Sequence, residues 1–511
     1  MSDSFRRIAV VVGGGPVGCL TALSLAKLGW RVELYEGRPD PRLPSSKAAH
    51  AQRSINLAIS SRGLSALAVV DPAIASRFLE TVIPMRARMI HESNGRTSSQ
   101  LYDIHGQCIN SIDRSLLNDR LLDEAAASPY ITISFKHKLT QADFDARRLE
   151  FQTPAGPHKA QFDLCVGSDG SYSNVRRQMM RFVRLDFEQE YIPHEYVELR
   201  MPPGLDSKGK PCFRMEPNYL HIWPRQSFML IALPNKDMSF TCTLFAPTEE
   251  LDKLLPPFSF QTTGHSRQQS PTPAQSARVA TWFSENFSDA VNLIGEDVLV
   301  HDFWHNPRSP LVCVKANPYH YRDRVILLGD AAHAMTPFFG QGLNCGLEDV
   351  RVLSTVLKTY GVDPTRHPSG DEDTNLARTL QMYTDTRRED LLAISQMAMD
   401  NYSQMRDHVT RPAYLLRKAI EEMLYRLTSK PTHVDFFLPA LACGTFTFPS
   451  DSKGRLWEWV PLYNMVTFRP DISYAMARRK AERQGKLLSV TGWVVLAASL
   501  TSAAMWIRRR S

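Results

Sequence analysis

Glycines and one acid near the start of the chain have the types and spacing of a nucleotide-binding site. Gly13-Gly14-Gly15-Pro16-Val17-Gly18 fits the pattern GxGxxG, and the acid Glu36 follows it. In such a unit the first glycine makes a tight turn, the second lets the backbone approach a pyrophosphate, and the third packs a helix onto a strand. An acid placed like Glu36 binds ribose hydroxyls. The stretch therefore predicts that the chain binds a dinucleotide.

A second stretch, Gly329–Asp349, carries an acid and a glycine turn behind an apolar run. Val325–Leu328 has no polar alternation, which is typical of a strand buried on both faces. Asp330 would lie at the carboxyl end of that strand, where open α/β sheets bind ligands. The turn Gly340-Gln341-Gly342 opens a predicted helix, whose free N–H groups can hold an anion without a basic side chain. The alternative is a tight turn with an acid that has no function.

Two other polar positions could meet a ligand. Asp169 follows the apolar run Phe162–Gly167 and could pair with Arg176 or contact a phosphate or nicotinamide, although Asp-Gly turns are common without a ligand. Arg114 falls in the first turn of a predicted helix, Asp113–Ala127, with Asp113 as its N-cap. A cation is unfavourable there unless it meets an anion. The alternative for Arg114 is a solvated side chain.

The first glycine stretch requires a strand on either side of a helix. The apolar run Ile8–Val12 predicts a buried strand, Val17–Leu28 a helix, and Arg31–Glu36 a second strand. Arg38 lies two residues beyond Glu36 and could meet the 2′-phosphate of NADP. Glu36 would repel that phosphate, so FAD or NAD is favoured as the bound dinucleotide.

Composition excludes several classes of protein. The 511 residues are 22% charged and 43% apolar, which indicates a folded globular protein. The formal charge of +7 comes without a basic stripe interleaved with aromatics, so nucleic acid is not indicated as a partner. The eight cysteines show no CxxC spacing, so neither a metal site nor a disulfide framework is predicted, and a reducing compartment fits best. No obligate protein partner is evident.

The remainder of the chain divides into four segments. Glu188–Phe245 is rich in β-forming residues and predicts an antiparallel sheet, which either floors a substrate pocket or is purely structural. Gln261–Ala277 is polar and predicts a disordered loop. Leu376–Leu427 is expected to be largely helical. Uncharged Leu487–Ile507, with basic residues on both sides, has about the length of a membrane-spanning helix, which favours a tail anchor over a buried helix. The helical segment has these candidate core positions: Met382, Leu391, Leu392, Ile394 and Met397.

Three motifs in this order resemble those of the single-component flavoprotein aromatic hydroxylases. They are the GxGxxG unit, the Asp-Gly run at Asp169, and Gly329-Asp330 followed by Pro337 and Gly340-Gln341-Gly342. Further blocks resemble the members of that family that hydroxylate kynurenine, namely RSINLAIS, MRARMIH, EYIPHEY, HIWPR, ALPN, SFTCTLF and PLYNMVTF. These blocks run from near the start of the chain to about Arg469, so the resemblance covers most of it.

The resemblance implies an α/β architecture with a Rossmann-like FAD-binding fold and an inserted antiparallel sheet. The implied regions are an FAD-binding part at 1–185 with a substrate-contacting segment at about 85–107, an antiparallel-sheet substrate region at 186–300, a second FAD-binding part at 301–360, a C-terminal helical region at 376–485, and a transmembrane tail anchor at 487–507. The tail would hold the protein in the mitochondrial outer membrane with its catalytic body facing the cytosol.

The resemblance also implies a reaction. NADPH, a transient co-substrate, reduces bound FAD, and O₂ then forms a C4a-hydroperoxyflavin. Its distal oxygen passes to the ring of L-kynurenine and gives 3-hydroxy-L-kynurenine, in a route of tryptophan degradation that leads to NAD through quinolinate. No catalytic nucleophile or base is required from the protein, because the amine on the substrate ring activates the attacked carbon. No metal is implied.

Two sets of site residues follow from the motifs and the resemblance. The FAD-binding residues are Gly13, Gly15, Val17, Gly18, Glu36, Arg38, Ala58, Arg114, Leu139, Asp169, Asp330, Pro337, Gly340, Gly342, Leu343 and Asn344. The substrate-binding residues are Arg88, Tyr102, Phe338, Asn401 and Tyr463. Arg88 matches the carboxylate-binding arginine of the family. In a strand, Arg86 would point to the same face as Arg88, so the motif match alone distinguishes the two.

Two other functions stay open. Another flavin aromatic hydroxylase or a lipid epoxidase would share the nucleotide motifs, but the blocks from MRARMIH onward disfavour both. A non-catalytic prenyl-binding carrier could use the same nucleotide fold. Retention of both Asp169 and Asp330 disfavours the carrier.

Overall fold

A parallel sheet forms the centre of the nucleotide-binding half. The computed structural model describes residues 6–46, 56–254, 270–365, 371–406, 411–428 and 458–489. Six strands lie in the order β20-β21-β12-β1-β2-β8, and only the edge pair β20–β21 is antiparallel. The apolar runs predicted as buried strands form β21, β12 and β1, which confirms these predictions. The strands are β1 (Ile8–Val12), β2 (Arg31–Glu36), β8 (Ile131–Phe135), β12 (Leu164–Gly167), β20 (His320–Tyr321) and β21 (Val325–Leu327).

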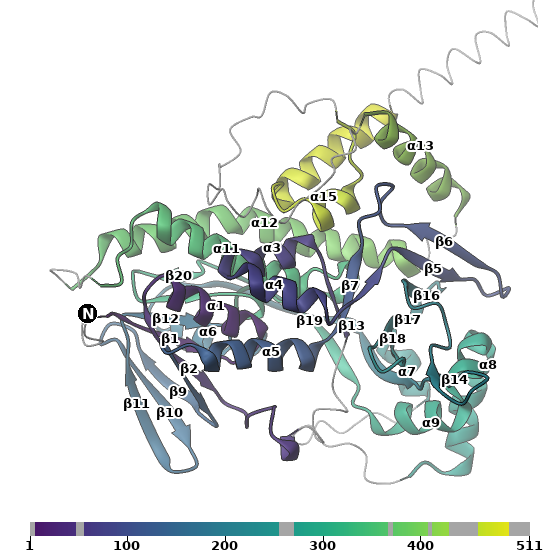
Figure 1. Ribbon diagram of the computed structural model, residues 1–511, viewed down its shortest axis with the longest axis horizontal. Helices are drawn as coiled ribbons and strands as arrows, with labels where there is room; N and C mark the ends of the chain where they lie inside the picture. Colours follow the sequence, from purple (N-terminus) through teal and green to yellow (C-terminus); the bar gives the residue numbers. More distant parts are fainter. Residues whose placement is uncertain are drawn as a thin grey trace, which may run out of the picture.

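Helices cover this sheet (Figure 1), and α1 and α6 follow the carboxyl ends of β1 and β12. Helix α1 begins at Pro16, inside the GxGxxG motif and one residue before its predicted start, and α11 begins at Gly342, as the sequence predicts. Asp113 caps α5 by accepting a 2.8 Å hydrogen bond from the Leu116 N–H. The helices of this half are α1 (Pro16–Lys27), α3 (Ser61–Val70), α4 (Pro72–Leu79), α5 (Arg114–Ala127), α6 (Asn174–Met179), α10 (Asp330–His333), the 3₁₀ turn η2 (Pro337–Phe339) and α11 (Gly342–Thr359).

A seven-stranded sheet forms the second half, in the order β19-β13-β18-β17-β16-β5-β6. This sheet extends beyond the predicted range 186–300, because β5 and β6 come from residues 87–101 and β19 from residues 309–317. It is also not wholly antiparallel, since β5 runs parallel to β16. Each strand alone is too short to reveal its partner in the sequence. The strands are β5 (Ala87–His91), β6 (Thr97–Leu101), β13 (Asp186–Met201), β16 (Tyr219–Arg225), β17 (Phe228–Pro234), β18 (Phe240–Pro247) and β19 (Ser309–Asn317).

Helices rather than strands fill the end of the predicted sheet region. Helix α8 begins at Pro273, so the predicted loop Gln261–Ala277 is wrong from that residue on; its part up to residue 269 lies outside the described residues. The reason is a capping box, in which the Thr272 and Gln275 side chains bond to each other's backbone N–H groups. These helices, at the lower right of Figure 1, are α7 (Thr248–Leu254), α8 (Pro273–Ile294) and α9 (Glu296–His305).

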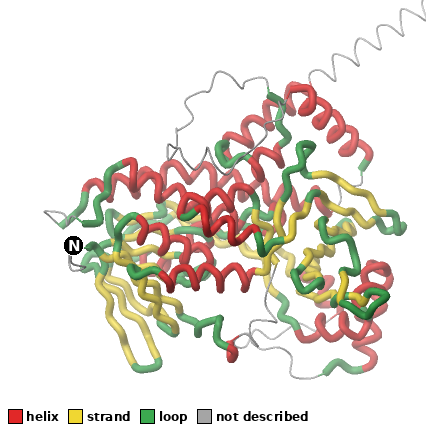
Figure 2. The backbone as a smooth tube through the Cα atoms, in the orientation of Figure 1, coloured by secondary structure: helices red, strands yellow, loops and turns green. Residues whose placement is uncertain are grey.

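The remaining described strands form three small sheets. The sheet β3-β7-β4 joins the two halves, and the sheet β11-β10-β9 projects from the first half at the lower left of Figure 2. Their strands are β3 (Asn56–Ile59), β4 (Ile83–Met85), β7 (Ile109–Asp113), β9 (Lys138–Asp143), β10 (Arg148–Thr153), β11 (Gly156–Gln161) and the pair β14 (Gly204–Leu205) and β15 (Pro211–Cys212).

The described part of the C-terminal region is largely helical, as predicted, and in Figure 1 α12 runs below α13 and α15. Leu391, Ile394 and Met397 are buried and Met382 is half-buried, but Leu392 is 44% exposed, because it turns away from the face that packs on α11. None of the described helices is both long and apolar enough to span a membrane. The predicted tail Leu487–Ile507 lies almost wholly outside the described residues. The labelled helices here are α12 (Thr374–Arg406), α13 (Pro412–Thr428) and α15 (Leu462–Phe468), and residues 474–489 are also helical.

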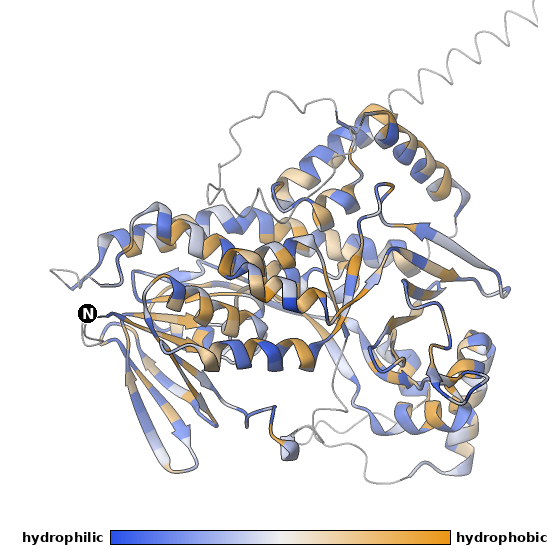
Figure 3. Ribbon diagram, viewed as in Figure 1, coloured by the Kyte–Doolittle hydropathy of each residue, from blue (hydrophilic) through white to orange (hydrophobic). Residues whose placement is uncertain are grey.

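Apolar side chains concentrate where the layers meet. Figure 3 shows the inner strands of the parallel sheet and the facing surface of α1 in the colour of hydrophobic residues. One core joins this sheet to α1, α3, α5, α11, α12 and α15, and a second core lies between the seven-stranded sheet and α7, α8 and α9. Two smaller apolar clusters adjoin them, one containing Met229 and Phe338 and the other containing Met85 and Tyr102.

Candidate functional site

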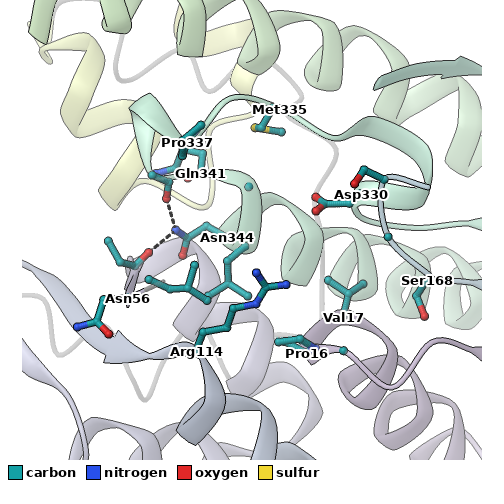
Figure 4. Close-up of a pocket in the computed structure, with 18 of the residues that line it drawn as sticks. Pro16, Val17, Asn56, Arg114, Ser168, Asp330, Met335, Pro337, Gln341 and Asn344 are labelled. Atoms are coloured by element: carbon teal, nitrogen blue, oxygen red, sulfur yellow. Dashed lines mark hydrogen bonds between the residues drawn. The ribbon is translucent and has the colours of Figure 1, made fainter. Parts of the chain in front are cut away.

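One cavity of about 610 Å³ joins the glycine turn after β1 to the face of the seven-stranded sheet. Its walls come from segments far apart in the sequence, including α1, α5, η2, α11 and α15. Figure 4 shows Arg114 and Asp330 pointing into it from opposite sides. All but two of the predicted site residues line this cavity; the exceptions are Gly18 and Asn401.

The three motif glycines differ in what surrounds them. Gly13 has φ +109°, and a Cβ there would lie 2.4 Å from the Ser168 carbonyl oxygen. A Cβ at Gly18 would lie 1.9 Å from the Gly13 carbonyl oxygen, so Gly18 holds the helix against the turn and does not reach the cavity. A Cβ at Gly15 would meet no protein atom within 4 Å. Only the space over Gly15 is therefore open to a ligand, as a backbone that approaches a pyrophosphate requires.

Glu36 ends β2 at the same edge of the cavity. One of its oxygens accepts the Gly14 N–H at 2.8 Å, and the other accepts the Arg38 N–H at 2.9 Å and Nε at 3.0 Å. Burial would raise the pKa of Glu36, but Arg38 and these N–H groups hold it below its ordinary value. Arg38 thus stabilises the ionised form of Glu36, which keeps lone pairs for ribose hydroxyls.

Asp169 and Arg176 do not form the direct pair that the sequence left open. The Asp169 carboxylate accepts the Asn174 and Val175 N–H groups at 2.7 and 3.1 Å and the Ser173 hydroxyl, so it caps α6. Arg176 donates instead to the carbonyl oxygens of Ala331 and Ser171. Arg176 therefore ties the Asp169 loop to the residue after Asp330.

The turn before α11 is fixed by its own side chains. Gly340 has φ +65°, and the Asn344 amide donates to the Ala58 and Gly340 carbonyl oxygens at 2.9 and 2.7 Å, as Figure 4 shows. The Asn344 side-chain oxygen accepts the Ser60 N–H at 2.9 Å. The first N–H groups of α11 have no partner within the helix, and the helix dipole is positive there. This end of the cavity suits a group that gains negative charge.

Arg88 and two tyrosines form the other end of the cavity. Arg88 is buried to 8% exposure, and its Nε has no hydrogen-bond partner among the described residues. Its guanidinium lies 5.5 Å from the Tyr102 ring centroid and 5.0 Å from that of Tyr463, and the two rings are stacked. Burial raises the pKa of both phenols, so they stay neutral beside the cation. A buried arginine with an unused N–H is suited to an anionic group such as a carboxylate.

Arg88 lines the cavity, whereas Arg86 does not. Met85 ends β4 and Ala87 begins β5, so Arg86 lies in the break between the strands, where its side chain is exposed. Asn401 faces a neighbouring cavity of about 410 Å³ and donates to the Phe338 carbonyl oxygen at 2.7 Å. Asn401 thus holds the backbone of the main cavity wall.

An apolar wall separates the two polar ends. Met229, Ile231 and Leu233 line it from alternate positions of β17, and the residues between them belong to the second core. Phe338 stacks on Tyr402 at 3.9 Å and meets Phe245 edge-on at 5.2 Å. Sequence reasoning missed the β17 residues, because both faces of that strand are apolar. These apolar and aromatic side chains form a surface suited to a flat aromatic group.

One group of possible metal ligands occurs among the described residues, behind the turn before α11. His333, Cys345 and Asp349 have donor atoms within 4.8 Å of one another. Arg387 already occupies the group, since its Nη2 lies 2.7 Å from Asp349 Oδ1 and 3.4 Å from Cys345 Sγ. Burial raises the pKa of Cys345, so the thiol stays protonated. The group is an ion-pair cluster.

Comparisons with known proteins identify relatives that match over nearly all of the chain. A family model described as an FAD binding domain matches residues 7–199 and 228–360. Kynurenine 3-monooxygenase of Cryptococcus neoformans var. neoformans serotype D (strain B-3501A) is 43% identical, and the alignment covers 100% of both proteins. Kynurenine 3-monooxygenase of Saccharomyces cerevisiae (strain ATCC 204508 / S288c) is 40% identical, with 96% of this chain and 94% of the yeast protein covered.

Solved structures share the fold at low identity. The tetrameric form of 2-methyl-3-hydroxypyridine-5-carboxylic acid oxygenase has a TM-score of 0.57 at 20% identity, covering 82% of this chain and 96% of that chain. p-Nitrophenol 4-monooxygenase PnpA from Pseudomonas putida DLL-E4 also has a TM-score of 0.57 at 20% identity, covering 82% and 93%. These likenesses confirm the mixed α/β fold of FAD-binding monooxygenases.

Proposed function

The chain belongs to the kynurenine 3-monooxygenase family of FAD-binding flavoproteins, and from that premise we propose that it hydroxylates L-kynurenine to 3-hydroxy-L-kynurenine. NADPH is the reductant, binding transiently, and O₂ is the oxidant. One observation carries the proposal. A buried arginine with an unused Nε lies beside a stacked pair of neutral tyrosines, at one end of the same cavity that begins at the glycine turn.

The residues present fit FAD. The open space over Gly15 accepts a pyrophosphate, Glu36 a ribose, and Asp330, whose side chain is exposed to the cavity, a hydroxylated chain. The N–H groups at Leu343 and Asn344 would stabilise negative charge on the ring system. When bound, FAD supplies the redox and oxygen chemistry, which no side chain can perform.

The protein's own part in the reaction is to orient the substrate and exclude water. Arg88 can grip the α-carboxylate of L-kynurenine with two parallel hydrogen bonds, and the hydroxyls of Tyr102 and Tyr463 lie beside it. The aromatic ring then lies along the apolar wall of β17 and Phe338. An apolar wall of this kind keeps water away from the reacting atoms.

The test compares two arginines of one segment. Arg88→Lys keeps the charge but loses the planar fork, which costs roughly 1.5–3 kcal/mol for a charged hydrogen bond. The variant should retain FAD yet need about tenfold or more L-kynurenine to stimulate NADPH oxidation. Arg86→Lys, exposed in the strand break, should behave as wild type. An Arg88→Lys variant with unchanged dependence on L-kynurenine would remove Arg88 from the site.

We further propose that Leu487–Ile507 anchors the protein in the mitochondrial outer membrane, with the catalytic body in the cytosol. The support is in the sequence. The segment has no charged residue, and Arg483 and Lys486 precede it while Arg508-Arg509-Arg510 follow it. An uncharged stretch of about this length is long enough to span a membrane, and Lys and Arg side chains near its ends can reach the membrane interface.

A further inference from the structure

Arg62 is a fully buried cation that the family resemblance does not explain. It lies in the first turn of α3, where the helix dipole disfavours a positive charge. Its exposure is 0%, so its hydrogen bonds must come from the protein. Those partners connect two parts of the site.

One set of partners is the end of α15, the helix that carries Tyr463. Arg62 Nε donates to the Val466 carbonyl oxygen at 3.0 Å, and Nη2 donates to those of Arg469 at 3.0 Å and Ile472 at 2.8 Å. These carbonyls lie at the negative end of the helix and just beyond it, where a cation stabilises the helix. Arg62 therefore fixes the position of α15 and, through it, the position of Tyr463 beside Arg88.

The other partner lies on the helix that begins at the flavin-binding turn. Arg62 Nη1 lies 2.6 Å from Glu348 Oε1 on α11. Burial would raise the pKa of Glu348, but Arg62, Arg387 and Arg351 lower it to about 2. Glu348 is thus ionised at neutral pH, and the Arg62 pair ties α11 to α15.

Tyr474 links Arg62 to the flavin-binding turn. The Arg62 guanidinium lies 4.2 Å from the Tyr474 ring centroid, and the Tyr474 hydroxyl donates to Gln341 Oε1 at 3.2 Å. Gln341 is the central residue of the turn Gly340-Gln341-Gly342 and is 2% exposed. The segment after α15 therefore contacts the flavin-binding turn directly.

We propose that Arg62 and Tyr474 are positioning residues that couple the substrate clamp at Tyr463 to the flavin-binding turn, an inference that rests on the proposed function. Ordering of Tyr463 by a bound carboxylate shifts or stiffens α15, and Arg62 and Tyr474 carry that change to α11 and Gln341. Without the coupling, the protein still binds FAD, but it holds the clamp loosely and responds weakly to substrate.

The test titrates the FAD-loaded protein with L-kynurenine and follows the flavin absorbance. Arg62→Lys should retain FAD and raise the Kd for L-kynurenine by about tenfold, as expected when charge-assisted hydrogen bonds are weakened. The matched control is Arg7→Lys. Arg7 is also 0% exposed, pairs with Asp373 at 2.6 Å and lies 4.8 Å from the Trp30 ring centroid. It differs in position, because it precedes β1 at the amino end of that strand, whereas the cavity lies at the carboxyl end. Arg7→Lys should lower thermal stability and leave the Kd within about twofold.

A double-mutant cycle separates coupling from general loss of stability. In a Tyr463→Phe background, Arg62→Lys should change the Kd little further, because Arg62 acts through Tyr463. A Kd for Arg62→Lys equal to that of Arg7→Lys, or fully additive effects, would overturn the coupling. If no Arg62 variant folds, Tyr474→Phe decides, since it removes only the hydroxyl bonded to Gln341. It should raise the Kd and reduce the substrate-induced spectral change, and wild-type behaviour would overturn the proposal.

These outcomes are distinct from a failure of the proposed function. A yellow wild-type protein whose flavin spectrum ignores L-kynurenine contradicts the proposed function. A responsive wild type with an unaffected Arg62→Lys variant contradicts the coupling alone.

Discussion

The open space around Gly15 is the most direct structural indication of a bound ligand. Its φ is −75°, an ordinary value for any residue, and no protein atom lies within 4 Å of a Cβ built there. A side chain at this position therefore meets space that only a ligand would fill. We predict that Gly15→Val folds but is isolated without FAD, which the ratio of flavin to protein absorbance measures.

Gly18→Ala is the contrasting variant for Gly15→Val. Its Cβ would lie 1.9 Å from the Gly13 carbonyl oxygen, so the helix must move and the protein should lose thermal stability. A yellow Gly15→Val protein with full activity would remove the glycine turn from the cofactor site.

At the residue scale, the sequence predicts groups whose role is local and misses those set by tertiary contacts. The motif spacing alone indicates Gly13, Glu36 and Asp330. The motif match selects Arg88 over Arg86, whereas the strand break between β4 and β5, which no periodicity reveals, explains why the Arg86 side chain is exposed. Asn401 matched a motif, but the fold turns its amide to the Phe338 carbonyl.

At the scale of elements, buried strands and capped helices were predictable and strand partners were not. The apolar runs of β1, β12 and β21 and the helix start at Gly342 were evident because local patterning specifies them. The parallel pairing of β5 with β16 joins residues 87–90 to residues 219–222. Such a pairing depends on tertiary packing, so local propensity does not determine it.

The membrane segment is also a prediction about one element. Removing residues 487–511 should release the protein from a membrane pellet while it keeps FAD and L-kynurenine-dependent NADPH oxidation. The measurement is the distribution of FAD-containing protein between pellet and supernatant after centrifugation. Equal pelleting of the truncated and intact chains would show that another part of the protein binds the membrane.

At the scale of the whole molecule, the site exists only because distant segments meet. The cavity takes its cradle from the loop after β1, its wall from β17, its turn from the start of α11, and Tyr463 from α15. Residues beyond 360, outside the matched FAD binding domain, thus complete a cavity that the domain begins. Folding of the C-terminal region and substrate binding are therefore expected to depend on each other.

This cavity is expected to use a flavin to transfer oxygen from O₂ to a clamped aromatic amino acid. The most direct measurement is mass spectrometry of the product formed from L-kynurenine and NADPH under ¹⁸O₂. The expected product is 3-hydroxykynurenine carrying one ¹⁸O atom, with no label incorporated when the label is supplied as water. Unlabelled product, label derived from water, or NADPH consumption that yields only peroxide would contradict this expectation.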